Sequence, residues 1–371
     1  MTERNRKVHR LVVKIGASVL TDAEGRLLPA RLASFAGQVA ACAASGRQVV
    51  VVSSGAIACG MAQLGLKRRP RELAQLQACA AIGQGELMRL YGEAFAQHDV
   101  VTAQVLLTQE DLADRRRHGN AKRTLLTLVG RRVIPIINEN DTVAVAEITF
   151  GDNDRLAAVV ASTVEAQLLV LLTDVEGLLH EGRLIERIDA TNHIAHEPLG
   201  GAKRQTTTGG MGSKLVAARI AGHDGIPTVI ANGLRPSILA ELLEGKPVGT
   251  LCVPAGTRLS RRKWRIAFAL RQPKGEVVVD AGAAAALLER GKSLLASGIL
   301  EVRGRFEAGD LIAVADASQR ELARGVTNFS ASELSRIRGL RSTEAAGVLG
   351  RNQAKEVIHR DHLVLAREVQ G

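Results

Sequence analysis

Aromatic side chains are scarce in this sequence: they make up 2% of its 371 residues. The core must therefore be built from aliphatic residues, and the 46% share of hydrophobic residues is enough for a sizeable one. Long hydrophobic runs are also missing, since none reaches the ~20 residues that span a bilayer. No cleavage pattern follows the charged residues 1–10, so we expect no signal peptide and no membrane partner.

Cysteine is also infrequent, with four residues in the chain. They are widely spaced and lie in apolar contexts, at Cys42, Cys59, Cys79 and Cys252. A disulfide framework or a zinc site would need closer pairs, so neither is expected. This pattern favours a reducing compartment, and we predict a cytoplasmic protein.

Basic residues outnumber acidic ones by 49 to 38, a formal net charge of +11. The excess falls entirely in the first 274 residues, because residues 275–371 contain 13 of each. Three clusters stand out: Lys67-Arg68-Arg69-Pro70-Arg71, Arg115-Arg116-Arg117 and Arg261-Arg262-Lys263. They indicate either a solvated basic face or attraction for a polyanion such as a polyphosphate or a nucleic acid.

The chain is too long for one ordinary domain, and its first ~265 residues alternate strand-like and helical patterns. The expected strands are continuous runs of β-branched residues and Leu, typical of strands covered on both faces. They are Leu11–Gly16, Gln48–Ser54, Val101–Thr108, Val133–Asn138, Gln167–Thr173 and Pro227–Ala231.

Apolar positions with helical spacing lie between these runs, from Leu32 to Ala43 and from Leu156 to Val164. The alternation predicts an α/β fold, a three-layer sandwich around a mainly parallel sheet. Ligands of such sheets bind beyond the carboxyl ends of the strands, so the residues that follow each strand are the candidates for function.

The pattern changes at residues 271–276, a polar stretch that we interpret as a linker. An Ala-rich helix and short strands follow, at Val277–Asp280, Ile299–Val302, Leu311–Ala315 and Leu322–Val326. We therefore predict a first domain over 1–270, a small strand-rich domain over 277–360 and a tail over 361–371.

Polar residues at the ends of the first two strands are candidates for an anion site. Lys14 stands in a buried-looking strand, where a charge is costly unless it meets an anion or the strand is an exposed edge. Ser53 and Ser54 precede a helix, where hydroxyls and amides could cradle an anion or could serve only as an N-cap.

Further polar groups follow the fourth strand, at Asn138-Glu139-Asn140-Asp141, and suit either a polar ligand or a turn. Asp154 opens the next helical stripe, where an acid could stabilise the helix dipole, orient lysines or approach a metal. The segment Gly209-Gly210-Met211-Gly212-Ser213-Lys214 fails the P-loop pattern, since Lys214 follows Ser213 and Leu215 follows Lys214. It still delivers a lysine at a helix start, which suits phosphate oxygens.

Together these segments resemble the amino acid kinase family, and within it the branch that phosphorylates glutamate. The matching segments are Val12–Gly16, Ser53–Ile57, Pro135–Asp141, Gly151–Asp154, Leu172–Asp174 and Gly209–Lys214. The region from about Gly275 to Arg360 is similar to a PUA domain, which implies a small β-rich barrel, so the resemblance covers nearly the whole chain.

The resemblance implies a phosphotransferase that uses ATP and Mg²⁺ to phosphorylate the side-chain carboxylate of L-glutamate, the first step of proline biosynthesis. Lys14, Lys214 and Asp154 would be catalytic: the lysines neutralise the phosphoryl oxygens and Asp154 holds them. Glutamate would be bound by Ser54, Asn138, Asp141 and Asn153. The nucleotide would be bound by Lys14, Thr173, Asp174, Gly209, Gly210, Met211, Gly212, Ser213 and Lys214, and Mg²⁺ would arrive on ATP without a dedicated protein site.

The resemblance further implies feedback inhibition by proline, a homo-oligomer (dimer or tetramer) and handover of the labile product to glutamyl phosphate reductase. Two alternatives differ from it. One is a kinase for another amino-acid carboxylate, N-acetylglutamate or aspartate. The other is RNA binding through the PUA-like domain, which the balanced charge of that region disfavours because phosphate neutralisation dominates such affinity.

Overall fold

The chain folds into two compact units, residues 1–258 and 259–371, in the computed structural model. The structure describes residues 8–22, 25–143, 153–189, 210–254, 273–350 and 356–366. The division after residue 258 falls within residues 255–272, which are outside the described ranges. The predicted boundary at residue 270 therefore stays a prediction.

The first unit is built on an eight-stranded sheet of order β3-β4-β2-β1-β5-β9-β10-β8. Its strands are β1 (Arg10–Ile15), β2 (Gln48–Ser53), β3 (Thr102–Leu107), β4 (Ile134–Glu139), β5 (Leu168–Thr173), β8 (Arg187–Asp189), β9 (Thr228–Asn232) and β10 (Thr250–Val253). All neighbours pair in parallel except β9 and β10. A separate short hairpin joins β6 (Leu179–His180) and β7 (Arg183–Leu184). The mainly parallel sheet confirms the expected fold class.

The central strands are buried along almost their whole length, which explains why the sequence shows them as unbroken apolar runs. Each of the six expected strands is present, with bounds within one residue of the expectation. Their carboxyl ends meet at one edge of the sheet, and the polar candidates Lys14, Ser54, Asn138 and Thr173 lie at or near these ends.

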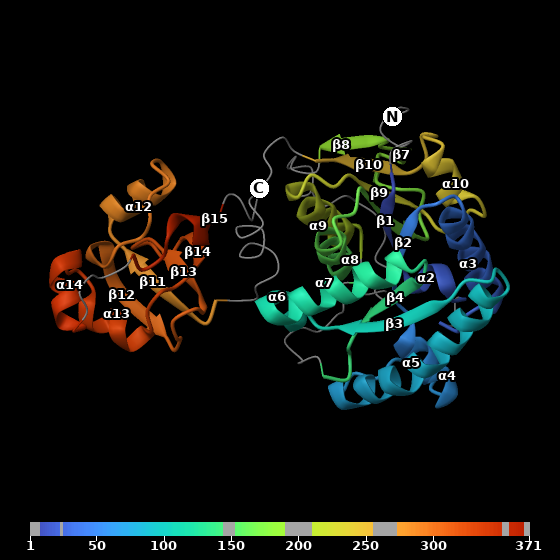
Figure 1. Ribbon diagram of the computed structural model, residues 1–371, viewed down its shortest axis with the longest axis horizontal. Coiled ribbons are helices and arrows are strands. Elements are labelled where there is room, and N and C mark those ends of the chain that lie inside the picture. The colour runs from blue at the N-terminus through green and yellow to red at the C-terminus, as the bar shows by residue number, and fades with distance from the viewer. Residues whose placement is uncertain are drawn as a thin grey trace. The chain divides into compact units, whose positions relative to one another are not determined.

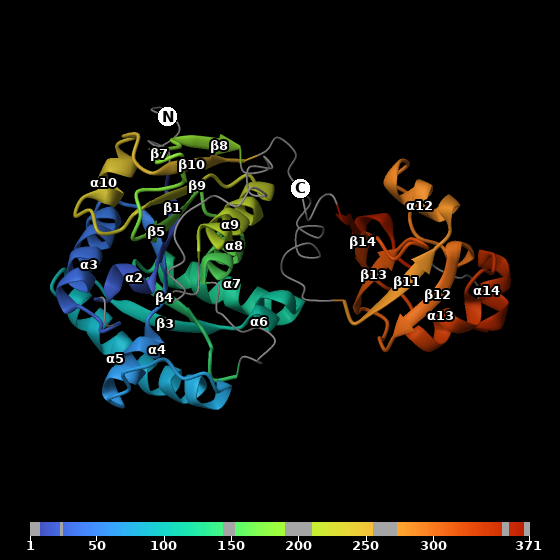
Figure 2. The same cartoon turned by 180° about the vertical axis from the view of Figure 1, so that it is seen from behind.

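Helices cover both faces of the sheet and make it the middle of three layers. They are α2 (Ala17–Leu20), α3 (Pro29–Ala44), α4 (Ala56–Gln63), α5 (Leu73–Ala96), α6 (Gln109–Ala113), α7 (Arg115–Gly130), α8 (Asn153–Thr163), α9 (Met211–His223) and α10 (Ile238–Leu243). Figures 1 and 2 show α3 and α10 on one side of β1 and β9, with α8 and α9 on the other. Leu11, Val13 and Ile15 of β1 belong to the core shared with α3, α5 and α10.

Two glycines bring α5 unusually close to α4. A Cβ built on Gly83 would lie 1.8 Å from the backbone oxygen of Ala56, and one on Gly60 would lie 1.8 Å from that of Cys79. Backbone therefore packs directly on backbone here, which only glycine permits. Ala56 begins α4 three residues after the end of β2 at Ser53, so this contact fixes the middle of α5 beside the end of β2.

The second unit contains a five-stranded sheet of order β12-β11-β13-β14-β15 with its own apolar core. Its strands are β11 (Gly275–Val279), β12 (Ile299–Gly304), β13 (Leu311–Ala315), β14 (Glu321–Val326) and β15 (Leu363–Leu365). Its helices are α12 (Ala281–Leu288), α13 (Ala331–Ile337) and α14 (Ser342–Val348), with short 3-10 turns η4 (Ala296–Gly298) and η5 (Arg360–His362). Among the described residues, β12 and β15 lie at the two edges of this sheet.

Two predicted boundaries differ from these elements. Gly275 and Glu276, expected in the linker, belong to β11 and pair with β12. Leu363–Leu365, expected in the tail, pairs with β14 and buries all three side chains. The final strand is only three residues long and follows a polar stretch, so its apolar signal is too short to stand out in the sequence.

Two further properties of the chain follow from the described residues. None of the helices in these ranges is long and apolar enough to cross a bilayer. All four cysteines are buried and free. Burial raises the pKa of Cys42 and Cys59 to about 11, although the Arg47 charge partly opposes the shift at Cys42, so these thiols stay protonated at neutral pH.

Candidate active site

Lys14 is a buried charge in the centre of the sheet. Its strand, β1, lies between β2 and β5, and only 6% of the lysine is exposed, so the alternative of an exposed edge strand is wrong. Side chains alternate along a strand, and Val13 and Ile15 face the core with α3. Lys14 therefore points to the opposite face, toward α8.

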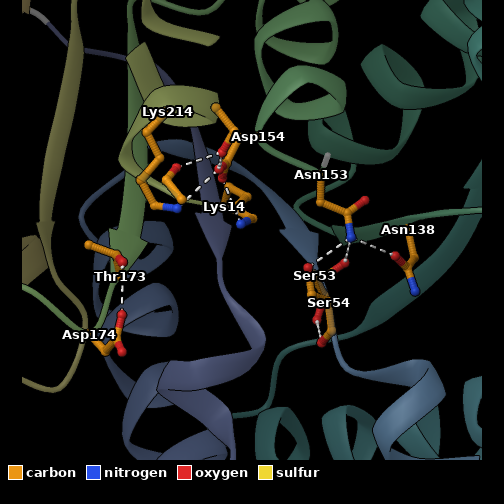
Figure 3. Close-up of polar contacts among 11 residues, drawn as sticks. Lys14, Ser53, Ser54, Asn138, Asn153, Asp154, Thr173, Asp174 and Lys214 are labelled. Carbon is orange, nitrogen blue, oxygen red and sulfur yellow. Dashed lines mark hydrogen bonds and ion pairs between the residues drawn. The ribbon is translucent and has the colours of Figure 1, made fainter. Parts of the chain in front are cut away.

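Asp154 forms ion pairs with both Lys14 and Lys214, which are far apart in the sequence (Figure 3). Lys14 Nζ lies 2.6 Å from Asp154 Oδ1, and Lys214 Nζ lies 3.1 Å from Oδ2. Ser213 Oγ donates a further hydrogen bond of 2.7 Å to Oδ2. Two ammonium groups from β1 and α9 thus share one carboxylate at the start of α8, which is the convergence that a shared phosphoryl group requires.

The electrostatics of this cluster favour full ionisation of Asp154. Burial by itself would raise the pKa of Asp154, whose exposed fraction is zero. The charges of Lys14 and Lys214, with hydrogen bonds from Lys14 and Ser213, more than offset burial and hold the pKa below its ordinary value. The three groups together carry one positive charge, so the cluster remains attractive to an anion.

Asn153, the residue before Asp154, serves a second cluster. Its Nδ2 donates to the Ser53 backbone oxygen at 3.1 Å, to Ser54 Oγ at 2.8 Å and to Asn138 Oδ1 at 3.1 Å. Successive helical residues point about 100° apart. Figure 3 accordingly shows Asp154 directed at the lysines and Asn153 at the ends of β2 and β4.

The Ser53–Ser54 segment is not an ordinary helix cap. Gly55, with φ of +116°, is the N-cap of α4, and no side chain caps this helix. Ser54 instead accepts from Asn153, while the buried Ser53 hydroxyl lies 2.8 Å from the hydroxyl of Tyr91 in α5. The end of β2 is therefore fixed by side chains from α8 and α5.

Asp141 lies in the turn after β4. The turn is closed by the Val143 amide, which donates to the Asn140 oxygen, so the expectation of a turn holds for this part of the segment. Burial raises the pKa of Asp141, and the Arg69 charge only partly offsets this effect. A partly desolvated carboxylate of this kind favours a cationic partner such as an ammonium group.

Apart from Lys14, the described residues that were predicted to bind nucleotide lie at the carboxyl end of β5 and at the start of α9. Thr173 is buried at the end of β5, and its hydroxyl donates to the exposed Asp174 carboxylate at 3.2 Å. Gly210 is the N-cap of α9 and has no side-chain cap, and Met211, Gly212, Ser213 and Lys214 form the first turn. Gly209 lies outside the described residues, as do Gly151 and Asp152.

The basic clusters are surface features where the structure describes them. Lys67, Arg68, Arg69, Arg71, Arg116 and Arg117 are exposed. Arg261-Arg262-Lys263 lies outside the described ranges. Within those ranges, no group of three or more His, Cys, Asp or Glu side chains could hold a metal ion.

Comparison with known proteins agrees with this geometry. Residues 9–232 match the model of the amino acid kinase family, and residues 275–349 match that of the PUA domain. The chain belongs to the amino acid kinase family. The second unit of this amino acid kinase contains the PUA domain that the sequence predicts.

Curated relatives of this amino acid kinase are similar over almost their full length. A glutamate 5-kinase from Pelobacter propionicus is 46% identical, and one from Citrifermentans bemidjiense is 47% identical. A glutamate 5-kinase from Thermus thermophilus is 48% identical. Each alignment covers 97% of this chain and 98% of the relative.

Two contributors to the site were not among the predicted residues of this amino acid kinase. Gln84 of α5 accepts a hydrogen bond from Asn138, and Tyr91 of α5 contacts Ser53. The signal for the first is the run Gly83-Gln84-Gly85, because glycines inside a helical pattern often mark a close approach of backbones. Ser213 was predicted to contact nucleotide, and here its hydroxyl bonds to Asp154.

Proposed function

We propose that this chain transfers the γ-phosphoryl group of ATP to the side-chain carboxylate of L-glutamate, giving L-glutamyl 5-phosphate and ADP. The observation that carries the proposal is the pair of buried ammonium groups, Lys14 and Lys214, on opposite oxygens of Asp154. Relatives at 46–48% identity over nearly the whole chain carry the same activity in their names.

The reaction needs positioning and charge neutralisation more than proton transfer. A carboxylate oxygen of glutamate forms the new bond to the γ-phosphorus, while the bond from that phosphorus to the β–γ bridging oxygen breaks and its electrons leave with ADP. The glutamate side chain is ionised at neutral pH, so no general base is required. Two anions must instead be brought in line, which cationic groups favour.

Lys14 and Lys214 are the groups that we assign to this neutralisation. Asp154 holds both ammonium groups in fixed positions, and preorganised charges of this kind need little rearrangement during the reaction. We assign to Asp154 the role of a positioning residue that keeps the ammonium groups apart and oriented. Ser213 supports the same carboxylate.

The substrate half of the site is assigned to Ser54, Asn138, Asp141 and Asn153. The amides and the hydroxyl offer hydrogen bonds, and Asp141 offers the negative charge that an α-ammonium group needs. Thr173, Asp174 and residues 209–214 are assigned to the nucleotide. The uncapped amides at the start of α9 suit phosphate oxygens, as do the two lysines.

We further propose that Mg²⁺ enters on the phosphates of ATP, where it would neutralise negative charge. Assembly into a homo-oligomer, inhibition by proline, delivery of the labile acyl phosphate to a reductase and a cytoplasmic location are also part of the proposal. The four free, buried thiols support the last of these.

Trapping of the acyl phosphate with hydroxylamine tests the function. The purified full chain with ATP and Mg²⁺ should form hydroxamate from L-glutamate and not from N-acetylglutamate or L-aspartate. Lys214→Ala should lower kcat by on the order of 10² to 10³. Lys122→Ala, which removes a surface lysine paired with Glu165, should leave kcat unchanged. Hydroxamate from N-acetylglutamate alone would contradict the proposal.

A further inference from the structure

Three side-chain amides from three elements are joined head to tail beside Ser54. Asn153 Nδ2 of α8 donates to Asn138 Oδ1 of β4 at 3.1 Å, and Asn138 Nδ2 donates to Gln84 Oε1 of α5 at 2.9 Å. We call Asn153, Asn138 and Gln84 the amide chain. Asn138 and Asn153 are the more deeply buried members, at 3% and 8% exposed.

The backbone fixes the direction of the amide chain. Asn153 Nδ2 also donates to the Ser53 carbonyl, which can only accept a hydrogen bond. The Glu139 amide donates to Asn138 Oδ1 at 2.9 Å, and a backbone N–H can only donate. If the side-chain amide of Asn153 were rotated by 180°, its oxygen would face the Ser53 carbonyl oxygen. If that of Asn138 were rotated, its NH₂ group would face the Glu139 N–H. Gln84 must therefore offer its oxygen to Asn138.

The amide chain consequently has a donor at one end and an acceptor at the other. Gln84 Nε2 and Asn153 Oδ1 are both buried, and within the described residues neither has a hydrogen-bond partner. Buried polar atoms of native proteins are nearly always paired. Two orphaned atoms of opposite character at the ends of one chain indicate a ligand that carries both an acceptor and a donor.

We propose that Gln84 is a substrate-binding residue whose Nε2 donates to the α-carboxylate of the amino-acid substrate. At the other end, Asn153 Oδ1 accepts from the α-ammonium group, whose charge we have assigned to Asp141 in the turn after β4. This inference rests on the proposed function and names a specificity determinant for it: the amide chain selects a substrate with both α-groups over a simple carboxylate.

The packing of α5 explains how a residue in the middle of a helix reaches the site. Gly83 brings this helix into backbone contact with Ala56, at the start of α4. Gln84 is the next residue, and its side chain spans the remaining distance to Asn138 at the end of β4. The position of Gln84 is therefore set by a rigid helix contact and not by a loop.

The variant Gln84→Glu keeps the hydrogen-bond acceptor of this side chain and removes its donor. A carboxylate oxygen of the substituted side chain can still accept from Asn138. The Nε2 donor, however, is replaced by a negatively charged oxygen that repels the α-carboxylate of the substrate. In the hydroxamate assay we expect KM for L-glutamate to rise at least about 100-fold and KM for ATP to change less than about threefold. Gln84→Leu, which removes both ends, should also raise KM for L-glutamate.

The matched control is Gln75→Glu, which adds the same charge on the same helix. Gln75 is exposed, and its side chain donates a hydrogen bond to Glu72 on the protein surface, so its replacement should leave both KM values within about twofold. Circular dichroism of each variant checks that it is folded.

A second substrate distinguishes direct contact from a merely structural role. 4-Aminobutanoate keeps the reacting carboxylate and an amine but has no α-carboxylate, so Gln84→Glu should lower its kcat/KM less than about threefold relative to the wild type. An equal loss with both substrates, or an unchanged KM for L-glutamate in Gln84→Glu, would overturn the inference. A wild-type protein that forms no hydroxamate from L-glutamate would overturn the proposed function as well.

Discussion

At the start of α8, two consecutive side chains serve different halves of the site. Asp154 binds Lys14 and Lys214, and Asn153 binds Ser54 and Asn138. The groups that we propose to bind the phosphoryl group and the amino acid are thus both held by the first turn of α8. A small displacement of this turn would disturb both halves at once, so we expect changes here to affect kcat and KM together.

Asp154→Asn should reveal the contribution of the buried ion cluster to stability. The folded-state pKa of Asp154 lies below its ordinary value of 3.8, so the cluster stabilises the fold fully above that pH and less as pH falls through the folded-state pKa. At pH 7 the variant leaves two buried ammonium groups without their counter-ion. We expect a loss of about 3–5 kcal/mol in the free energy of unfolding, measured with urea.

The same variant has a defined pH dependence. Its difference from the wild type should shrink in urea titrations as pH falls below 3.8, where the unfolded wild type takes up a proton at Asp154 that the folded protein, with its lowered pKa, does not yet bind. Asp22→Asn, which removes a partner of the exposed Arg26, serves as a surface control. Equal stability of Asp154→Asn and the wild type at pH 7 would show that the cluster contributes nothing to folding.

Asp141→Asn should make the folded protein more stable at pH 7 while weakening its binding of L-glutamate. Burial raises the pKa of Asp141, so its ionised form is disfavoured by folding, and its contribution to stability decreases as pH rises through the folded-state pKa. The neutral variant should therefore be more stable at pH 7 and not below about pH 4. Loss of the charge opposite the α-ammonium should raise KM for L-glutamate by about 10- to 100-fold. A less stable variant with unchanged KM would contradict both assignments.

Among the elements, the pair α4–α5 depends most strongly on glycine. Gly83→Ala would set a methyl group 1.8 Å from the Ala56 carbonyl oxygen, so the helices must separate. We expect a loss of at least about 3 kcal/mol in unfolding free energy, with a raised KM for L-glutamate because Gln84 moves from Asn138.

Gly85→Ala provides the control within the same helix. A Cβ at this exposed position would meet no atom within 4 Å. Alanine is the better helix former, so this change should stabilise the protein by about 0.5–1 kcal/mol and leave KM unchanged. Similar thermal and urea midpoints for Gly83→Ala and Gly85→Ala would show that the close contact is not required.

Elements were predictable from sequence where burial leaves a simple pattern. The strands β1, β2, β4, β5 and β9 are mostly apolar because both faces are covered, and their ends mark Lys14, Ser54, Asn138 and Thr173. Short edge strands give no such pattern: β8 contains Arg187 and Asp189 within three residues, and β15 is also three residues long. For Gln84, the run Gly83-Gln84-Gly85 indicates a close approach of backbones, but the hydrogen bond to Asn138 depends on how α4 and α5 pack, which the local sequence does not show.

At the scale of the molecule, the two units have separate cores and different charge. The apolar core of the first unit draws on residues 8–251, and that of the second on residues 277–365. All the positive net charge lies before residue 275. Every residue that we propose for the site belongs to the first unit, so we expect the reaction to need this unit alone.

A chain that ends at residue 272 should therefore retain the reaction. We expect kcat and KM for L-glutamate within about threefold of the full chain in the hydroxamate assay. Residues 273–371, expressed alone, should show a cooperative thermal transition by circular dichroism, because they keep a complete core. Loss of activity in the shortened chain, with its secondary structure intact, would mean that the PUA domain takes part in catalysis.

The alternation of side chains along β1 limits how this gene can change length. Val13 and Ile15 lie in the apolar core, and Lys14 between them lies with Asp154. Inserting or deleting a single codon within this strand would exchange the two sides, placing the ammonium group among hydrocarbon and a valine beside the carboxylate. Natural variation in length should consequently accumulate at the β6–β7 hairpin, where His180 and Arg183 are exposed, and avoid the strand that carries Lys14.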